Sequence, residues 1–401
     1  MIESSFQSVM MPLGVIGGNM IKSITAVTRE IDDIEAAVEE IVTALNIEEN
    51  LLRNSLGIIS CFSEFHETGV LKAICDALPF ECVGATSVLS SADGETDQII
   101  FIITVLTSDD CEFETIVLPL TENYAETINE ELSGLLSKRE DKPTLMLSYF
   151  PIKNTVSGDM ILDVIDNASG GVPLFGTMAI DHLPDYSTSR TIHNGDVYKE
   201  ASVLGLIYGN VNYSFEIASL NEEKIGKQEA IITESNGSIL IGVNEKSVLE
   251  FLNEVGISRS VIETGLGILP LVVDHRDGTK PVARAVFALT PEGYAVCGGA
   301  MPVGATIAVG RISMDDVLQT TENIVRHIDT AEGIILGYSC MARYLAMGPD
   351  IDAEARKMCE ITGGEQYLFS VSGGEICPLP NANGRLKNVF HNYTIVLCRL
   401  N

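Results

Sequence analysis

Segments with helical spacing and segments with strand-like composition alternate along almost the whole chain of 401 residues. Apolar residues recur at helical intervals in residues 30–46, which predicts an amphipathic helix. Short uninterrupted apolar runs, such as LGIISCF and PTLMLSYF, are typical of strands that are buried on both faces. This alternation predicts an α/β chain of the mixed α+β type, in which helices pack against sheets.

The polar segment SLNEEKIGKQ, residues 219–228, is the least hydrophobic stretch in the middle of the chain and predicts a linker. It separates two predicted sheet-and-helix sandwich domains, residues 20–218 and 229–401. Residues 1–19 show no periodicity and predict a flexible leader. Both halves place helix, buried strand, helix and β-ribbon in a similar rhythm, which favours a distant internal duplication.

The balance of charge disfavours two classes of partner. The chain has 56 acidic and 25 basic side chains, a formal net charge of −31 at pH 7. Such a surface repels phosphate backbones and anionic headgroups, so we expect no nucleic-acid partner. No apolar stretch approaches the roughly 20 residues of a membrane-spanning helix, so we expect no direct membrane insertion.

The nine cysteines are typical of a reducing compartment. Their number is odd, no CxxC pair occurs, and most lie in apolar runs, so we expect free thiols and a cytoplasmic protein. The standard phosphate-loop, dinucleotide, zinc-protease and hydrolase motifs are missing, and the six histidines lie far apart. We therefore expect neither an enzyme nor a structural metal.

The segment YLFSVSGGEICPLP is the most unusual stretch, because an apolar strand runs into Gly373 and Gly374 and the acidic Glu375 follows at once. Two glycines allow close approach of the backbone to a ligand, and a carboxylate can receive a cationic or hydrogen-bonding group. An amine or an amino acid would suit this arrangement. The alternative is a β-bulge or a tight bend with a solvated glutamate.

Two arginines are candidates for holding a ligand carboxylate bidentately. Arg343 lies just beyond the strand that ends at Cys340 in GYSCMAR, and Arg284 lies inside the apolar run VARAVFAL. A guanidinium in such a run needs a partner if it is buried. The alternatives are an ion pair with an acidic neighbour for Arg343 and a solvent-facing edge position for Arg284.

Three further positions are candidate ligand contacts. His391 and Asn392 precede the last predicted strand, and Gly176 opens the segment GTMAIDH, which ends at His182. Each has a structural alternative, as a turn former, a hydrogen-bond partner of a nearby loop, or a glycine that starts a connection.

Several of these segments together resemble the FIST family, whose paired amino-terminal and carboxy-terminal domains occur in bacterial signal-transduction proteins. The resemblance extends from about Met20 to the end of the chain. The matching segments are GGVPLFGTMAIDH, TIHNGDVYKEASVLGLIYGN, VARAVFALTPEGYAVCGGAMPVGATIAVGR, GYSCMAR, SGGEICPLP and FHNYTIVLCRL. A departure lies in the first half, where ECVGATSVLSSADGE is a looser version of the family's turn.

The resemblance implies an intracellular sensory domain that binds a small ligand, amino acids among them, and regulates a histidine kinase, a diguanylate cyclase or a chemotaxis receptor. No cofactor is expected on this interpretation. The predicted ligand-binding residues are Arg284, Cys340, Arg343, Gly373, Gly374, Glu375, His391, Asn392 and Gly176.

Two other hypotheses stay open. Some members of the family resemble haem-binding sensors of nitric oxide that act on a histidine kinase or a cyclic-di-GMP enzyme, which makes His391 or His182 a candidate haem ligand. The weaker hypothesis is a cysteine-dependent enzyme, with Cys340 or Cys377 as nucleophile and Glu375 or His391 as its acid or base.

Overall fold

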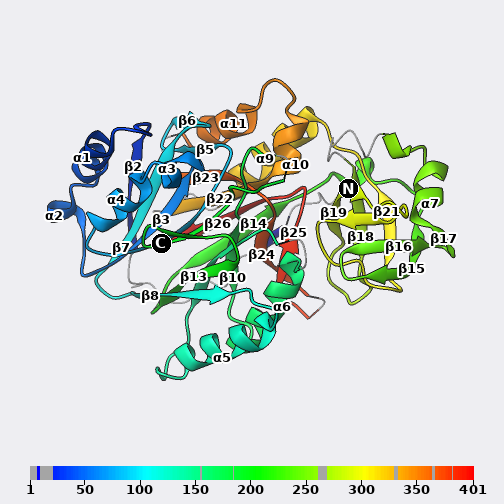
Figure 1. Ribbon diagram of the computed structural model, residues 1–401, viewed down its shortest axis with the longest axis horizontal. Coiled ribbons are helices and arrows are strands. Elements are labelled where there is room, and N and C mark those ends of the chain that lie inside the picture. The colour runs from blue at the N-terminus through cyan, green and yellow to red at the C-terminus, as the bar shows by residue number, and fades with distance from the viewer. Residues whose placement is uncertain are drawn as a thin grey trace.

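Three sheets, each covered by helices on one face, surround a common core, and a small barrel lies beside them (Figure 1). The computed structural model describes residues 7–9, 21–153, 156–183, 185–260, 269–328, 333–363, 366–381 and 383–401. The mixed α+β class predicted from the sequence is confirmed.

Sheet B lies at the end of the molecule opposite the barrel, mostly in blue and cyan at the left of Figure 1. Its strand order is β12-β11-β4-β3-β7-β2, in which only β3 and β4 are parallel neighbours. The strands are β2 (Lys22–Thr28), β3 (Asn54–Cys61), β4 (Glu81–Thr86), β7 (Phe101–Ser108), β11 (Thr191–His193) and β12 (Asp196–Tyr198). Helices α1 (Ile34–Leu45) and α4 (Val70–Asp76) pack on its outer face, and the short helices α2 (Ile47–Asn50) and α3 (Glu64–Glu67) adjoin them.

Sheet C has the order β25-β24-β10-β9-β13-β8, again with one parallel pair, β9 and β10. Its strands are β8 (Glu112–Pro119), β9 (Leu145–Phe150), β10 (Leu174–Met178), β13 (Ala201–Tyr208), β24 (Glu375–Pro380) and β25 (Leu386–His391). Helices α5 (Tyr124–Leu136) and α6 (Gly158–Ser169) cover its outer face.

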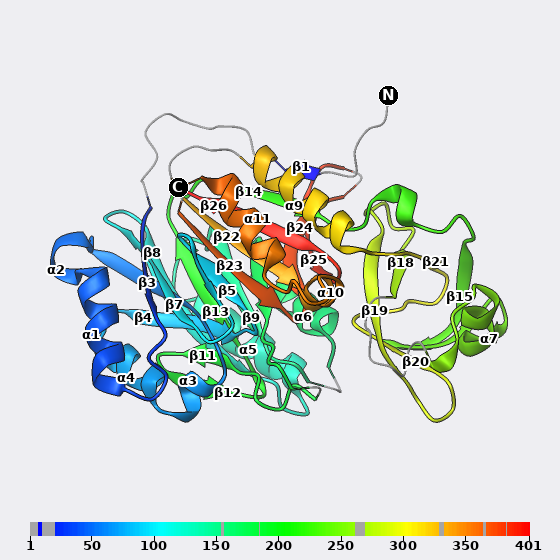
Figure 2. The ribbon, with the colours of Figure 1, turned by 90° about the horizontal axis from the view of Figure 1, so that it is seen from above.

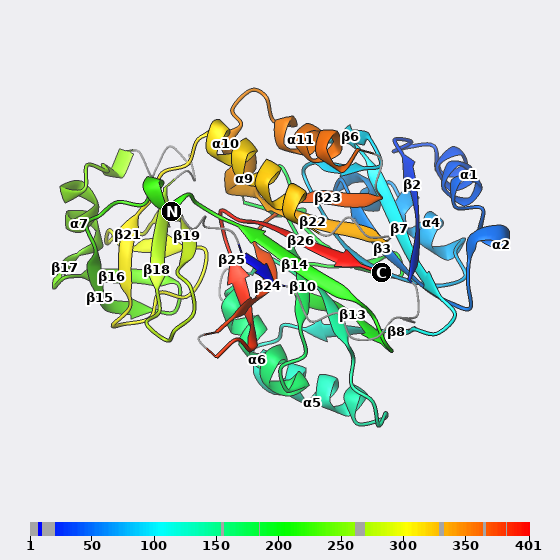
Figure 3. The ribbon, with the colours of Figure 1, turned by 180° about the vertical axis from the view of Figure 1, so that it is seen from behind.

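Sheet A has the order β1-β14-β26-β22-β23-β5-β6, with β22 and β23 as its parallel pair. Its strands are β1 (Gln7–Val9), β5 (Ser90–Ala92), β6 (Glu95–Asp97), β14 (Tyr213–Ala218), β22 (Ile334–Cys340), β23 (Tyr367–Ser372) and β26 (Ile395–Leu400). Helices α9 (Met314–His327) and α11 (Ala353–Thr362) pack on its outer face, and α10 (Met341–Ala346) follows β22. Figure 3 shows these helices on the opposite side of the molecule from α5 and α6.

The three sheets repeat one topology. Each sheet is built mainly from one continuous unit of the chain. The first strand of the unit (β2, β8 or β14) pairs with its last strand (β7, β13 or β26), which pairs with the first of the two parallel strands. A hairpin from another unit pairs with the second parallel strand and completes the sheet. The hairpin β5–β6 follows β4 of sheet B but pairs with β23 of sheet A. In the same way β11–β12 follows β10 but pairs with β4, and β24–β25 follows β23 but pairs with β10. The units therefore exchange hairpins in a closed cycle.

This triplication corrects the predicted internal duplication. The order of predicted elements is similar in the two halves of the sequence. The first half nevertheless contains two of the units, and the barrel interrupts the third, so the threefold repeat does not appear in that order. The inner faces of all three sheets contribute to one apolar core. The helices lie outside, around this core (Figure 2).

The barrel is inserted into the third unit, between β14 and α9. Its strand order is β15-β21-β18-β19-β20-β16-β17, and β15 also pairs with β16, which closes it. The elements are β15 (Ala230–Asn236), β16 (Ile239–Val243), β17 (Lys246–Ser247), α7 (Val248–Glu254), β18 (Pro270–Asp274), β19 (Val282–Leu289), β20 (Ala295–Cys297) and β21 (Thr306–Val309). The chain does not simply meander through the barrel, because β21 pairs with β18 and β15 and not with β20.

The predicted boundary at residues 219–228 falls where the chain enters the barrel, with η1 (Glu222–Lys224) inside it. Strands from both predicted domains nevertheless share sheets A and C. The predicted leader, residues 1–19, contains β1, because the edge of β14 offers unpaired backbone groups to Gln7–Val9. The rest of that leader lies outside the described residues.

Local sequence explains several element ends. Ser313 and Asp316 form a capping box at the start of α9, and Ser157 accepts a hydrogen bond from the Met160 amide at the start of α6. Strands β11 and β12 form a tight hairpin, since Asn194 and Gly195 adopt the positive φ angles that a two-residue turn requires. No helix in the described part of the chain combines the length and apolar character that a membrane crossing needs.

The barrel docks on sheet C through a buried ion pair. Arg284 of β19 is fully buried, and its Nη2 donates to Asp159 Oδ1 of α6 at 2.8 Å. Its Nη1 donates to the Phe390 carbonyl at 2.8 Å, and the second Asp159 oxygen accepts from the Ala300 amide of the barrel. Asn392 adds a bond by accepting from the Ala285 amide at 3.3 Å.

Replacing Arg284 with methionine should destabilise the protein by about 3 kcal/mol, because it leaves the Asp159 carboxylate at the interface without its cation. Urea unfolding measures the loss, and hydrogen exchange at the Ala285 and Ala300 amides should become faster. The control is Arg326→Met, which removes an exposed pair with Glu322 and should cost at most about 1 kcal/mol. Equal losses in the two variants would contradict the docking role.

Candidate functional site

A row of mostly polar residues crosses the inner face of each sheet at equivalent positions, near the carboxyl ends of the parallel strands. Residues paired in register point to the same face of a sheet, so these rows face one another at the centre. We call them the polar layer. Its nine residues are Ser60, Ala85 and Thr191 in sheet B, Tyr149, Thr177 and Glu375 in sheet C, and Tyr338, Ser370 and Ser90 in sheet A.

All nine residues of the polar layer are buried. Apolar side chains fill the core on one side of it, so the layer is where the common core turns polar. Ligands of open α/β sheets commonly bind at the carboxyl ends of the parallel strands. The position of the polar layer therefore marks the first place to look for a binding site.

Most hydroxyl groups of the polar layer have hydrogen-bond partners. The Ser60 and Ser90 hydroxyls lie 2.7 Å apart and join sheets B and A. Thr177 Oγ1 donates to Ser372 Oγ at 2.7 Å, and Ser372 Oγ donates in turn to the Gly374 carbonyl at 2.7 Å. This short chain of bonds fixes the bend between β23 and β24, immediately before Glu375.

Glu375 is the exception. It is fully buried, and among the described residues neither carboxyl oxygen has a hydrogen-bond partner. Burial raises the pKa of Glu375 well above its ordinary value, and the neighbouring Ser372, Arg343 and Thr394 backbone offset that rise only in part. This shift favours the protonated, uncharged form of the carboxyl group. A neutral carboxyl group can both donate and accept a hydrogen bond.

Arg343 is fully engaged within the protein. Its Nη2 donates to Glu354 Oε1 at 2.7 Å, and its other nitrogens donate to hydroxyl groups of α9 and β22. Ser339 supplies the second Glu354 oxygen with a hydrogen bond of 2.7 Å. Of the two interpretations drawn from the sequence, the ion pair with an acidic neighbour is the one found, and it fastens α10 to α9 and α11. Arg284 is likewise engaged, by Asp159.

Cys340 and Cys377 are poor nucleophiles in this setting. Burial raises the pKa of both thiols, and the nearby Glu375 raises that of Cys340 further. A protonated thiol reacts slowly, because the thiolate is the reactive form. Nothing in the geometry of these two cysteines therefore supports the hypothesis of a cysteine-dependent enzyme.

The two histidines proposed as haem ligands do not fit that role. His391 is fully buried, its Nε2 lies 3.0 Å from the Cys377 carbonyl, and burial lowers its pKa to about 4. His182 is exposed and stacks on Phe62 with the ring centres 5.1 Å apart. A haem needs an open axial position inside an apolar cavity, and neither histidine lines the hollow beside α1 or the narrow space between the three sheets. Those residues also contain no group of three acidic, histidine or cysteine side chains that could hold a metal ion.

The predicted glycines have a packing role. A Cβ on Gly176 would overlap the Ser148 carbonyl oxygen of the parallel neighbour, and a Cβ on Gly374 would overlap the Phe390 ring. Gly373 lies against the carbonyl oxygens of Met178 and Ala179, and its amide donates to Met178 at 2.9 Å. These glycines let β10, β23 and β24 approach closely enough to bring Thr177 beside Glu375.

The structure thus brings some predicted site residues together and separates others. Cys340, Gly373, Gly374 and Glu375 gather where sheets A and C meet, and His391 pairs in register with Glu375 across β24 and β25. Arg284 and Asn392 belong instead to the docking interface of the barrel. Sequence reasoning missed Tyr149, Thr177 and Tyr338 altogether. The signal that could have found them is the similarity of the strand endings GIIS, MLSY and ILGY.

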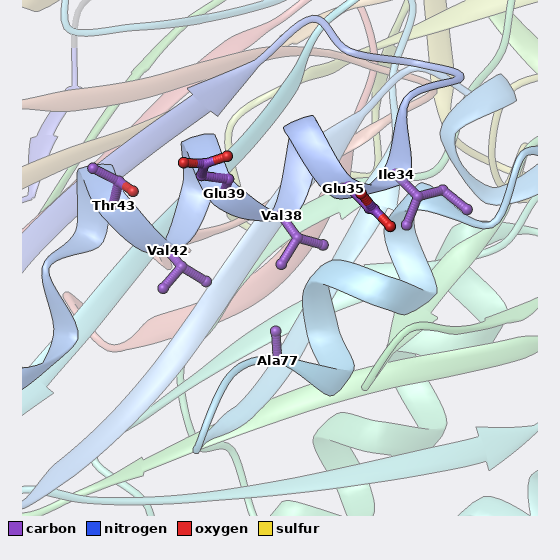
Figure 4. Close-up of a pocket in the computed structure, with 7 residues that line it drawn as sticks. All are labelled: Ile34, Glu35, Val38, Glu39, Val42, Thr43 and Ala77. Carbon is purple, nitrogen blue, oxygen red and sulfur yellow. The ribbon is translucent and has the colours of Figure 1, made fainter.

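A separate hollow lies on the far side of sheet B (Figure 4). It is open and shallow, and its walls come from α1 and from Ala77 after α4. Ile34, Val38 and Val42 give it an apolar character, while Glu35 and Glu39 lie at its rim. None of the residues predicted from the sequence lies in it.

Replacing Glu375 with glutamine should stabilise the protein increasingly as the pH rises. Above the ordinary pKa of glutamate the unfolded chain loses the Glu375 proton and the folded chain keeps it, so wild-type stability falls by up to about 1.4 kcal/mol per pH unit. Glutamine has no such proton. Urea unfolding between pH 4 and pH 8 should show a gap between variant and wild type that opens with pH. The exposed Glu130→Gln on α5 is the matched control, and a gap that is the same at every pH would argue against a protonated Glu375.

Comparison with known families identifies the chain. A FIST N domain matches residues 55–246, and a FIST C domain matches residues 246–378. Their common boundary falls inside the barrel, at β17. A search of curated proteins finds no match. FIST domains are associated with sensing in signal transduction. The tandem arrangement predicted from the sequence is confirmed, and this chain belongs to the FIST family.

Proposed function

We propose that this protein senses a small metabolite, such as an amino acid or an amine, and that Glu375 is its central ligand contact. The supporting observation is the carboxyl group of Glu375, which is fully buried in the polar layer and has no hydrogen-bond partner among the described residues. An unsatisfied buried polar group costs roughly 1–3 kcal/mol. A ligand that hydrogen-bonds to Glu375 recovers that cost, and this recovery is part of its binding energy.

The surroundings of Glu375 define how a ligand is held. Both candidate arginines are already paired, Arg284 with Asp159 and Arg343 with Glu354. A carboxylate ligand would have to displace one of these acids. The proposal therefore relies on hydroxyl and backbone groups near Glu375, among them Thr177 and Ser372, and not on an arginine clamp.

The barrel is the element through which binding is communicated. Cys340 and Tyr393, both near Glu375, pack against Val272, Ala283 and Ala285 of the barrel. The two chain segments that connect the barrel to the rest also pair with each other, at Ile225 and Gly310. A ligand that prefers one orientation of the barrel shifts the population of that orientation, by no more than its difference in affinity for the two. The output of this shift is the regulation of a separate partner, for which a histidine kinase, a diguanylate cyclase and a chemotaxis receptor are the proposed classes.

The proposal is tested by thermal-shift measurements with the twenty amino acids, the common biogenic amines and a set of small amides and diols. At least one compound should raise the melting temperature of the wild type. Its affinity, measured by calorimetry, should fall about tenfold or more in Glu375→Gln, since a hydrogen bond to a charged or strongly polar group contributes about 1.5–3 kcal/mol.

Glu130→Gln is again the control and should bind as the wild type does, because Glu130 is exposed on α5. The pH dependence separates two kinds of ligand. A cationic amine would ionise Glu375 and release its proton, so its affinity should rise with pH, whereas a neutral ligand should show no such trend. No stabilising compound, or equal affinity in both variants, would count against the proposal.

A further inference from the structure

A narrow space lies at the centre of the molecule, where the three sheets meet. At no point is it wide enough for a water molecule. Each sheet lines this space with its two parallel strands. Its lining residues are Ile59, Ser60, Ala85 and Thr86 from sheet B, Tyr149 and Thr177 from sheet C, and Tyr338, Ser370 and Val371 from sheet A.

The wall of this axial pocket is rich in hydroxyl groups, although the pocket is dry. Empty cavities in proteins are normally apolar, because polar walls hold water when there is room for it. Here Tyr149 is almost fully buried, and its hydroxyl has no hydrogen-bond partner among the described residues. The Tyr338 hydroxyl, from a different sheet, lies nearby and influences the pKa of Tyr149.

The lining contains no charged side chain among its nine described residues. Moving an ion from water into such surroundings is expensive unless a counter-charge meets it. Hydroxyl groups, in contrast, both donate and accept hydrogen bonds. The wall therefore selects against carboxylates and ammonium groups and favours a neutral molecule with donors and acceptors.

We infer that the axial pocket binds a small uncharged polar molecule, of the amide, urea or diol class, held by the hydroxyl groups of Tyr149 and Tyr338. This inference rests on the proposed sensory function, but at this pocket it points to a neutral ligand and not to the amino acid or amine proposed for Glu375. Thr177 connects the two sites, because it lines the pocket and pairs in register with Glu375. The ligand enters by parting the walls, since the space between them is too narrow for even a water molecule.

Separation of the walls by the ligand also affects the docking of the barrel. Tyr149 belongs to sheet C and Tyr338 to sheet A, so a molecule bonded to both bears on the angle between these sheets. The barrel contacts the same two sheets, through Phe390 on one side and Cys340 on the other. Binding at the centre and docking of the barrel thus act on the same pair of sheets.

The test uses matched pairs of probes that differ in charge: acetamide and acetate, lactamide and lactate, urea and guanidinium. The full chain is labelled with 3-fluorotyrosine, and its ¹⁹F spectrum is recorded with each probe up to about 50 mM, since fragments this small bind weakly. The chain has 11 tyrosines. Tyr149→Phe and Tyr338→Phe assign the two resonances that matter, and Tyr294→Phe in the barrel is the control variant.

At least one neutral probe should shift the Tyr149 and Tyr338 resonances in a saturable way, and its charged counterpart should bind at least tenfold more weakly. Tyr149→Phe should weaken the neutral probe about tenfold, and Tyr294→Phe should leave its binding unchanged. If the neutral probes shift neither resonance, or charged probes bind equally well, the inference fails.

The same measurement separates this inference from the proposed function. A ligand that requires Glu375 but leaves both tyrosine resonances unmoved would overturn the axial pocket and keep the sensor. A probe that shifts both resonances and binds Glu375→Gln as tightly as the wild type would keep the pocket and overturn the role of Glu375.

Discussion

The exchange of hairpins among three sheets is the constraint on which the rest of the structure depends. A sheet of this kind is buried on both faces, by helices outside and by the other two sheets inside. Its parallel strand pair has an open edge at β4, β10 or β23, and each edge is completed by a hairpin from another unit. The backbone hydrogen bonds of all three sheets are therefore satisfied only when the cycle closes. That closure sets the polar layer at the centre and holds its three rows in register.

The need of buried charges for partners explains which side chains the buried arginines contact. In a strongly acidic protein a buried guanidinium readily finds a carboxylate, and Arg284 and Arg343 each found one. These pairs join elements that are distant in sequence, the barrel to α6 and α10 to α11. Glu375 has no such partner, and its proton takes the place of a counter-charge. Two arginines with a carboxylate partner mark structural sites, whereas the acid without a cationic partner marks the candidate binding site.

Much of the secondary structure could be predicted from the sequence, and the topology could not. The helix within residues 30–46 and the buried strands in LGIISCF and PTLMLSYF follow from local spacing and composition, and all three were found. Hairpin exchange leaves no local trace, since a strand that pairs with its own unit and one that pairs with another have the same composition. The sequence indicates that a buried Arg284 needs a partner, but only the fold identifies that partner as Asp159. Tyr149 and Tyr338 look like ordinary core aromatics until three strands are superposed.

The exchanged hairpins also set the order in which the chain can mature as it is synthesised. The hairpin of residues 90–97 is made early, yet the strand it pairs with, residues 367–372, comes near the end. Until then sheet A does not exist, and the open edge of β10 waits for residues 375–380. Contacts of such long range fold slowly and leave strand edges exposed in the meantime. The nascent chain is thus most vulnerable to aggregation while the barrel is emerging, after the residues of two units have been synthesised and before the third unit can complete the cycle.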